Sequence, residues 1–102
     1  MDNVKVKICG ITNLADASLA VELGASALGF IFAPSPRQMT PQKVCKIIRA
    51  IPPFVKTVGV FVNEETTAIR EVKQHCGLDL VQLHGDESPD LCDELMPYAI
   101  KA

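Results

Sequence analysis

Short strand-like segments alternate with helix-like segments along the whole sequence, and this alternation limits the possible folds more than any other feature. The strand-like segments are short apolar or alternating runs, and the helix-like segments carry apolar residues at helical spacing. We expect strands at 4–9, 27–32, 58–62, 80–84 and 98–102, and helices at 13–23, 40–51, 66–76 and 88–96. Strand starts recur every ~20 to 30 residues, as in consecutive βαβ units. This order predicts a parallel sheet in an α/β protein, either doubly wound or closed into a barrel.

The helix-like segments begin and end at residues typical of helix boundaries. Thr40-Pro41 and Ser88-Pro89 each place a capping side chain before a proline at the first helical position. Gly24 follows the end of another predicted helix, where glycine is common. The apolar stripes that we expect against a sheet are Leu14, Ala17 and Val21; Val44, Ile47, Ile48 and Ile51; Ile69, Val72 and Cys76; and Leu91, Cys92, Leu95 and Met96.

The side chains of the first and fourth strands favour the barrel. Polar or reactive residues share one face of these strands, namely Lys5, Lys7, Cys9, Gln82 and His84. Apolar residues occupy the other face of the first strand, namely Val4, Val6 and Ile8. A doubly wound sheet has helices over both faces, so both would be apolar, whereas the filled interior of a barrel accepts polar groups. We therefore predict a fold of the TIM (βα)8-barrel family.

The length of the chain covers only half of such a barrel. An eight-unit barrel typically has about 250 residues and at least roughly 200, but this chain has 102. Its helices would all lie on the outside, so the inner face of the half would be open. We expect a fragment, a split half, or a chain that must pair.

Composition excludes several classes of partner. The formal net charge is −2, the sequence pI is about 5.6, and no basic run stands out, which argues against binding to nucleic acid or an anionic membrane. The segment Met1–Lys5 lacks the apolar core of a signal peptide, so we expect a cytoplasmic protein. The four cysteines form no CxxC pair and have no histidine at metal-ligand spacing, which predicts free thiols in a reducing compartment.

Four short motifs resemble those of one enzyme family. In chain order they are Lys7-Ile8-Cys9-Gly10-Ile11-Thr12, Gly29-Phe30-Ile31-Phe32 with Ser35-Pro36-Arg37, Val58-Gly59-Val60-Phe61-Val62-Asn63, and Gln82-Leu83-His84-Gly85-Asp86-Glu87. Their order and spacing are similar to those of N-(5'-phosphoribosyl)anthranilate isomerases, enzymes of tryptophan biosynthesis, over nearly the whole chain. The resemblance implies a (βα)8 barrel and an Amadori rearrangement of the aminoaldose phosphoribosylanthranilate to the aminoketose carboxyphenylamino-deoxyribulose phosphate. It implies no redox cofactor and no metal.

The resemblance also implies roles for four residues, and the strand pattern suggests a role for a fifth, Lys7. The reaction needs a general acid to open the ribose ring and a general base to remove a proton from the neighbouring carbon. In the family the base is the cysteine that matches Cys9. Lys7, on the same strand face, would supply positive charge that favours a thiolate. The resemblance places Arg37 near the anthranilate carboxylate, and Gln82 and His84 in the same pocket.

Part of the family's machinery has no counterpart in this sequence. The general acid of the family is an aspartate after the sixth strand, and its phosphate loops follow strands seven and eight. Asp86 lies near a strand end but does not match the position of the acid. We therefore interpret residues 1–102 as a single N-terminal half-barrel segment, (βα)4 plus strand five, which would be weak or inactive alone.

Simpler interpretations stay open for the same residues. A strand cysteine is usually a small buried apolar residue, and only the motif favours catalysis for Cys9. Arg37 would ordinarily be a solvated charge, His84 a hydrogen-bonded core histidine, and Lys7 a residue that fills the barrel interior. The other three cysteines, Cys45, Cys76 and Cys92, lie on predicted helices and are expected to be structural. The alternative function is a non-catalytic half-barrel that self-associates through its open inner face.

Overall fold

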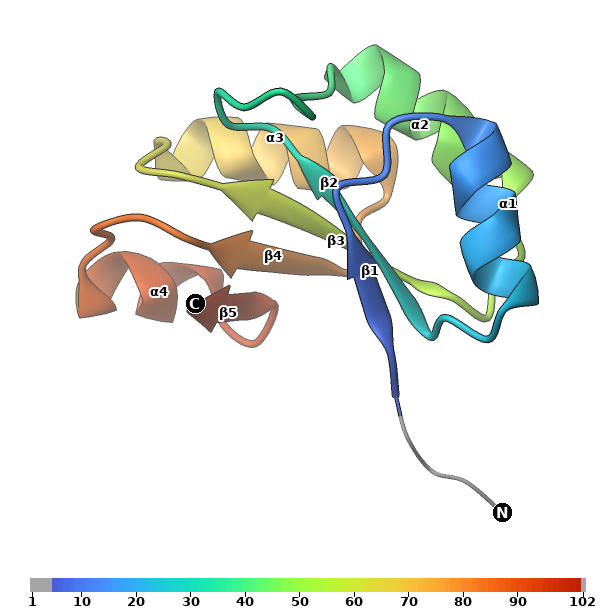
Figure 1. Ribbon diagram of the computed structural model, residues 1–102. Coiled ribbons are helices and arrows are strands. Elements are labelled where there is room, and N and C mark those ends of the chain that lie inside the picture. Colours follow the sequence, from blue (N-terminus) through green and yellow to red (C-terminus); the bar gives the residue numbers. More distant parts are fainter. Residues whose placement is uncertain (1–4, 102) are drawn as a thin grey trace.

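A computed structural model of the chain describes residues 5–101 (Figure 1). The elements are β1 (Lys7–Cys9), α1 (Leu14–Glu22), β2 (Ala27–Ile31), α2 (Pro41–Ala50), β3 (Lys56–Phe61), α3 (Thr66–Cys76), β4 (Leu80–Leu83), α4 (Pro89–Leu95) and β5 (Ala99–Lys101). Their order is the predicted alternation of strands and helices. The predictions for Met1 to Val4 and for Ala102 fall outside the described residues.

The five strands form one parallel sheet in the order β1-β2-β3-β4-β5. Strands that are consecutive in sequence are therefore neighbours in the sheet, whereas the strand order of a doubly wound sheet reverses at a switch point. The helices follow one another around the outside of the curved sheet (Figure 1). This is the arrangement of a TIM-barrel-like α/β fold, as the polar strand faces predicted.

The core lies between the outer face of the sheet and the helices. The largest fully buried side chains of this layer lie on the outer strand face or on the helices above it, and they are Leu28, Phe30, Val44, Ile69, Val81 and Leu83. Val58 is also fully buried but lies on the inner face, in register with Gly29 and Leu80. Burial of a side chain of this size contributes about 1.5–3 kcal/mol. The helices and the outer face of the sheet therefore form one packed layer.

The predicted helix boundaries are confirmed where a cap defines them. The Thr40 side chain accepts a hydrogen bond from the Lys43 backbone N–H at 3.3 Å, and proline follows at the first helical position. Gly77 ends α3 with φ 72°, in the left-handed region that favours glycine. Within residues 5–101, no helix is long and apolar enough to cross a membrane.

Two of the predicted buried stripes are wrong at one residue each. Leu14 is 43% exposed, because the face of α1 that packs on the sheet is made by the alanines Ala17 and Ala20. Met96 is 57% exposed, since α4 ends at Leu95 and the backbone of Met96 is extended, which takes its side chain off the helical stripe.

The first strand is shorter than predicted and lies at an edge of the sheet. It pairs only with β2, in the register Lys7↔Ala27 to Cys9↔Gly29. Val6 and Ile8 form the predicted apolar side but are 43% and 39% exposed, because among the described residues no strand and no second helix cover that side. This edge is therefore an exposed apolar surface.

Candidate active site

Cys9 is the last residue of β1 and lies at the carboxyl end of the parallel sheet. Its side chain packs over Gly29 of β2, where an added Cβ would lie 3.0 Å from the Cys9 Sγ. The backbone N–H groups of Gly10 and Ile11 both donate to the Gly29 carbonyl, at 3.0 and 3.1 Å. Because Gly29 has no side chain, the Cys9 thiol packs directly against β2, and Cys9 is exposed to solvent there.

Arg37 reaches the same place from the loop after β2. Its backbone N–H donates to the Ser35 hydroxyl at 2.9 Å, which stabilises a tight turn in the proline-containing loop. The side chain then lies over Gly10, where an added Cβ would be 2.8 Å from the Arg37 Cδ. Gly10 has φ +84°, so both its backbone and the space above it require glycine. The Arg37 side chain therefore packs against Gly10, the residue that follows Cys9.

A groove of about 440 Å³ has Cys9 and Arg37 at one end. Thr12 and Asp16, from the start of α1, also line it. The rest of its wall is the apolar side of β1 and the adjacent face of α1, namely Val6, Ile8, Leu19, Ala20, Leu23 and Ala25. The polar part of the lining comes from Cys9, Thr12, Asp16 and Arg37.

Lys7 contacts Gln82 across the interior of the sheet. The Lys7 Nζ donates a hydrogen bond to the Gln82 Oε1, although β2 and β3 separate β1 from β4. The sheet must therefore curve enough to bring the inner faces of β1 and β4 together, as in a barrel. This contact brings together two predicted pocket residues, and it engages the ammonium group that we expected to favour a Cys9 thiolate.

His84 follows β4 and lies next to the end of β3. Its backbone N–H donates to the Phe61 carbonyl at 2.9 Å, and its side chain is exposed. The strand register places Gln82, and hence His84 two residues later, on the same sheet face as Cys9. Cys9, Gln82 and His84 therefore face the same side at the carboxyl end of the sheet, as predicted.

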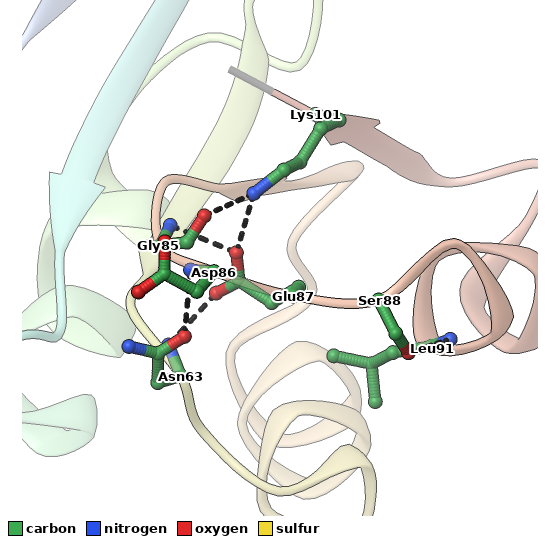
Figure 2. A network of polar contacts seen from close by, with 7 residues as sticks. All are labelled: Asn63, Gly85, Asp86, Glu87, Ser88, Leu91 and Lys101. Carbon is green, nitrogen blue, oxygen red and sulfur yellow. Dashed lines mark hydrogen bonds and ion pairs between the residues drawn. The ribbon is translucent and has the colours of Figure 1, made fainter.

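A polar network at this end was not predicted from the sequence. Glu87, which we interpreted as part of a turn, has a side chain that is only 1% exposed and forms a 2.8 Å ion pair with Lys101 of β5 (Figure 2). Asn63, after β3, donates its backbone N–H to the same carboxylate at 2.7 Å. The sequence does not reveal this network, because the burial of Glu87 is known only from the structure. Its partners Asn63 and Lys101 also lie 24 and 14 residues away in sequence.

The other cysteines are distant from this site. Cys45 of α2 and Cys76 of α3 are both buried, with their Sγ atoms 2.9 Å apart, and Cys92 of α4 is half-buried. Burial, together with the neighbouring thiol, raises the pKa of Cys76 to about 12. Cys45 and Cys76 are core residues, as predicted, and Cys9 is the exposed thiol among them.

Comparison with known proteins places the chain in a family. The sequence profile described as N-(5'phosphoribosyl)anthranilate (PRA) isomerase matches residues 6–102. The chain belongs to this isomerase family. The isomerase of Pelobacter propionicus is 55% identical over 100 residues, which cover 97% of this chain and 48% of that protein. The isomerase of Syntrophus aciditrophicus is 57% identical over 100 residues, covering 96% and 44%.

Solved structures of phosphoribosylanthranilate isomerases have the same fold. The crystal structure from Thermotoga maritima has a TM-score of 0.91 and 48% identity, and covers 96% of this chain and 48% of its own. The structure from Thermus thermophilus has a TM-score of 0.92 and 42% identity, with 96% and 50% covered. Another isomerase structure, at 48% identity, is a complex with reduced 1-(o-carboxyphenylamino)-1-deoxyribulose 5-phosphate. The chain spans about half the length of the isomerases that it matches.

Proposed function

We propose that this chain carries the general base and the anthranilate side of a phosphoribosylanthranilate isomerase site. In this proposal residues 1–102 form (βα)4 plus strand five of an eight-unit barrel, in a protein of the reducing cytoplasm. The reaction is the Amadori rearrangement of N-(5-phosphoribosyl)anthranilate to 1-(2-carboxyphenylamino)-1-deoxyribulose 5-phosphate. The observation that carries the proposal is the packing of Arg37 against Gly10, the residue that follows Cys9, with Cys9 and Arg37 lining one groove.

Cys9 is proposed as the base that isomerises the ring-opened imine. Its thiolate removes the proton from the carbon next to the imine carbon, and the electron pair of that C–H bond moves toward the imine nitrogen. The nitrogen, protonated when the ring opens, becomes an amine, and an enolamine results. The former imine carbon then gains a proton and the hydroxyl on the neighbouring carbon loses one, which gives the aminoketose. Solvent exposure of the thiol and its fixed position over Gly29 support this role.

Arg37 is proposed to bind the anthranilate carboxylate. A guanidinium can make two parallel hydrogen bonds to a carboxylate, which fixes direction as well as distance. Because Arg37 packs against Gly10 and lines the same groove as Cys9, a substrate held by Arg37 would present its amine-bearing carbon near the thiol. Gln82 and His84 would line the sugar side from β4, and Lys7 would orient Gln82 through their hydrogen bond.

Turnover by the purified chain tests the proposal. The assay follows the loss of phosphoribosylanthranilate fluorescence, with Cys9→Ala as the test variant and Cys92→Ala as the matched control, since Cys92 is a half-buried helical thiol. We expect weak or no turnover by the chain itself, and measurable binding of the reduced product analogue that Arg37→Ala weakens about tenfold or more. Analogue binding that Arg37→Ala leaves unchanged would contradict the assignment of Arg37.

The second candidate function is a non-catalytic half-barrel that self-associates. Apolar side chains are exposed at both edges of the sheet, Val6, Ile8, Leu19 and Leu23 beside β1, and Met96, Tyr98 and Ile100 beside β5. Exposed apolar surface of this kind is typical of an interaction site. Sedimentation velocity separates the candidates, because a stable homodimer that neither binds the analogue nor turns over substrate favours the second.

A further inference from the structure

The Glu87 carboxylate is a buried charge at the carboxyl ends of three strands. One oxygen accepts hydrogen bonds from the Gly85 backbone N–H and the Lys101 ammonium, both at 2.8 Å, and the other accepts from the Asn63 backbone N–H at 2.7 Å (Figure 2). A carboxylate with 1% side-chain exposure is costly unless its oxygens are bonded. Here donors come from the loop after β3, the loop after β4, and β5 itself.

Two residues that donate to Glu87, Lys101 and Asn63, also hold the loops to each other through further hydrogen bonds. Lys101 donates to the Gly85 carbonyl oxygen as well as to Glu87, and the Asn63 side-chain oxygen accepts from the Asp86 backbone N–H at 2.8 Å. The fit is close, because a Cβ on Gly85 would lie 2.6 Å from the Asn63 Oδ1. The loop after β4 therefore has one tightly determined path.

This path fixes the backbone of His84. Its own N–H is bonded to the Phe61 carbonyl, which determines the peptide unit before it. The N–H of the next residue, Gly85, is bonded to Glu87, which determines the peptide unit after it. The side-chain rotamers open to a residue depend on its φ and ψ, and these two bonds restrain both angles at His84.

Proton transfer is not the function of this carboxyl group. The hydrogen bonds that Glu87 receives outweigh the effect of burial and lower its pKa to about 2. The group is thus ionised at neutral pH, enclosed, and bonded at both oxygens. It does not meet the requirements for the general acid of the reaction, which must be protonated and reach the substrate.

We propose that Glu87 is a positioning residue for His84. Together with Lys101, it clamps the peptide units on both sides of Gly85 and so directs the His84 imidazole over the carboxyl end of the sheet. This proposal rests on the proposed function in one respect, which is that His84 contacts the substrate in the pocket beside Cys9. The network itself is a property of this chain.

The orientation of His84 can be measured without a substrate. In the isotope-labelled chain, coupling constants and nuclear Overhauser effects give the χ1 population of His84, and hydrogen exchange reports on the Gly85 amide. In the wild-type chain we expect one dominant His84 rotamer. In both Glu87→Gln and Lys101→Met we expect His84 to exchange among several rotamers and the Gly85 amide to exchange about 10- to 100-fold faster. Asp86→Asn is the matched control, one residue away, and should leave both readouts unchanged. A His84 rotamer distribution that neither variant alters would overturn the proposal.

A double-mutant cycle on ligand binding separates positioning from a merely structural role. The dissociation constant of the reduced product analogue is measured for Glu87→Gln, His84→Ala and the combination. If Glu87 acts through His84, both single variants weaken binding, and the combination is no weaker than His84→Ala alone. Additive losses would overturn the proposal. A wild-type chain that does not bind the analogue would count against the proposed function only, because the rotamer measurement still decides the role of Glu87.

Discussion

The stability that the Glu87 network contributes should depend on pH in a range set by its carboxyl group. Burial acts to raise the pKa of Glu87, but hydrogen bonds from Lys101, Asn63 and Gly85 lower it from 4.5 to about 2. As the pH falls, Glu87 is therefore protonated in the unfolded chain before it is protonated in the folded chain. Its contribution to stability is complete above about pH 5 and is lost as the pH falls through about 2. At about 1.4 kcal/mol per pKa unit, the contribution is about 3.4 kcal/mol at pH 7 and about 1.4 kcal/mol at pH 3.

Glu87→Gln tests this calculation because it keeps the size of the side chain and removes its titration. The free energy of unfolding is measured by urea denaturation at pH 7 and pH 3, and the variant is subtracted from the wild type at each pH. We expect this difference to shrink by about 2 kcal/mol at pH 3. Asp86→Asn is the control, since the Asp86 carboxylate accepts no hydrogen bond among the described residues, and its difference should hold constant. A Glu87 difference that is equal at the two pH values would refute the reasoning.

Three further changes probe the local geometry. Asn63 has φ 50°, so Asn63→Ala should destabilise the chain by about 1 kcal/mol more than Asn63→Gly in urea denaturation. Gly59→Ala would bring a Cβ within 2.6 Å of the Leu78 Cδ1 and should cost about 1–3 kcal/mol, measured by thermal unfolding. With iodoacetamide and peptide mass mapping, Cys9 should alkylate first and Cys76 last, because Cys9 is exposed while burial raises the pKa of Cys76 to about 12.

The sequence predicted the order of the elements because each boundary is local. A capping hydroxyl followed by proline, as at Thr40 and Ser88, acts on a helix start within three residues. Exposure at the edges was less predictable. Leu14 has the spacing of a buried residue, but α1 lies at the edge of the sheet and packs through its alanines. A helical pattern predicts which face of a helix is apolar, but it does not predict how much of the sheet is available to bury that face.

The candidate site also has residues that the sequence predicted and residues that it did not. Cys9 and Arg37 lie in short motifs that carry the family resemblance, so both could be named in advance. The packing of Arg37 against Gly10, the residue after Cys9, depends on the path of the loop after β2, and only the structure shows it. Glu87 was missed because its partners come from β5 and from the loop after β3, and no local pattern links them. Groups that act through long-range contacts are not visible to local sequence analysis.

The carboxylates near Cys9 bear directly on whether the chain can work alone. Glu87 is ionised and enclosed, so Asp16 is the carboxylate that shares the groove with Cys9 and Arg37 among the described residues. Its Oδ2 accepts from the Asn13 Nδ2 at 3.0 Å, which makes it part of the cap of α1. We therefore expect Asp16→Asn to lower stability by about 1 kcal/mol and to leave any weak turnover of the chain unchanged. Turnover that depends on Asp16 would mean that this capping residue supplies the acid, and that this chain holds a working acid–base pair.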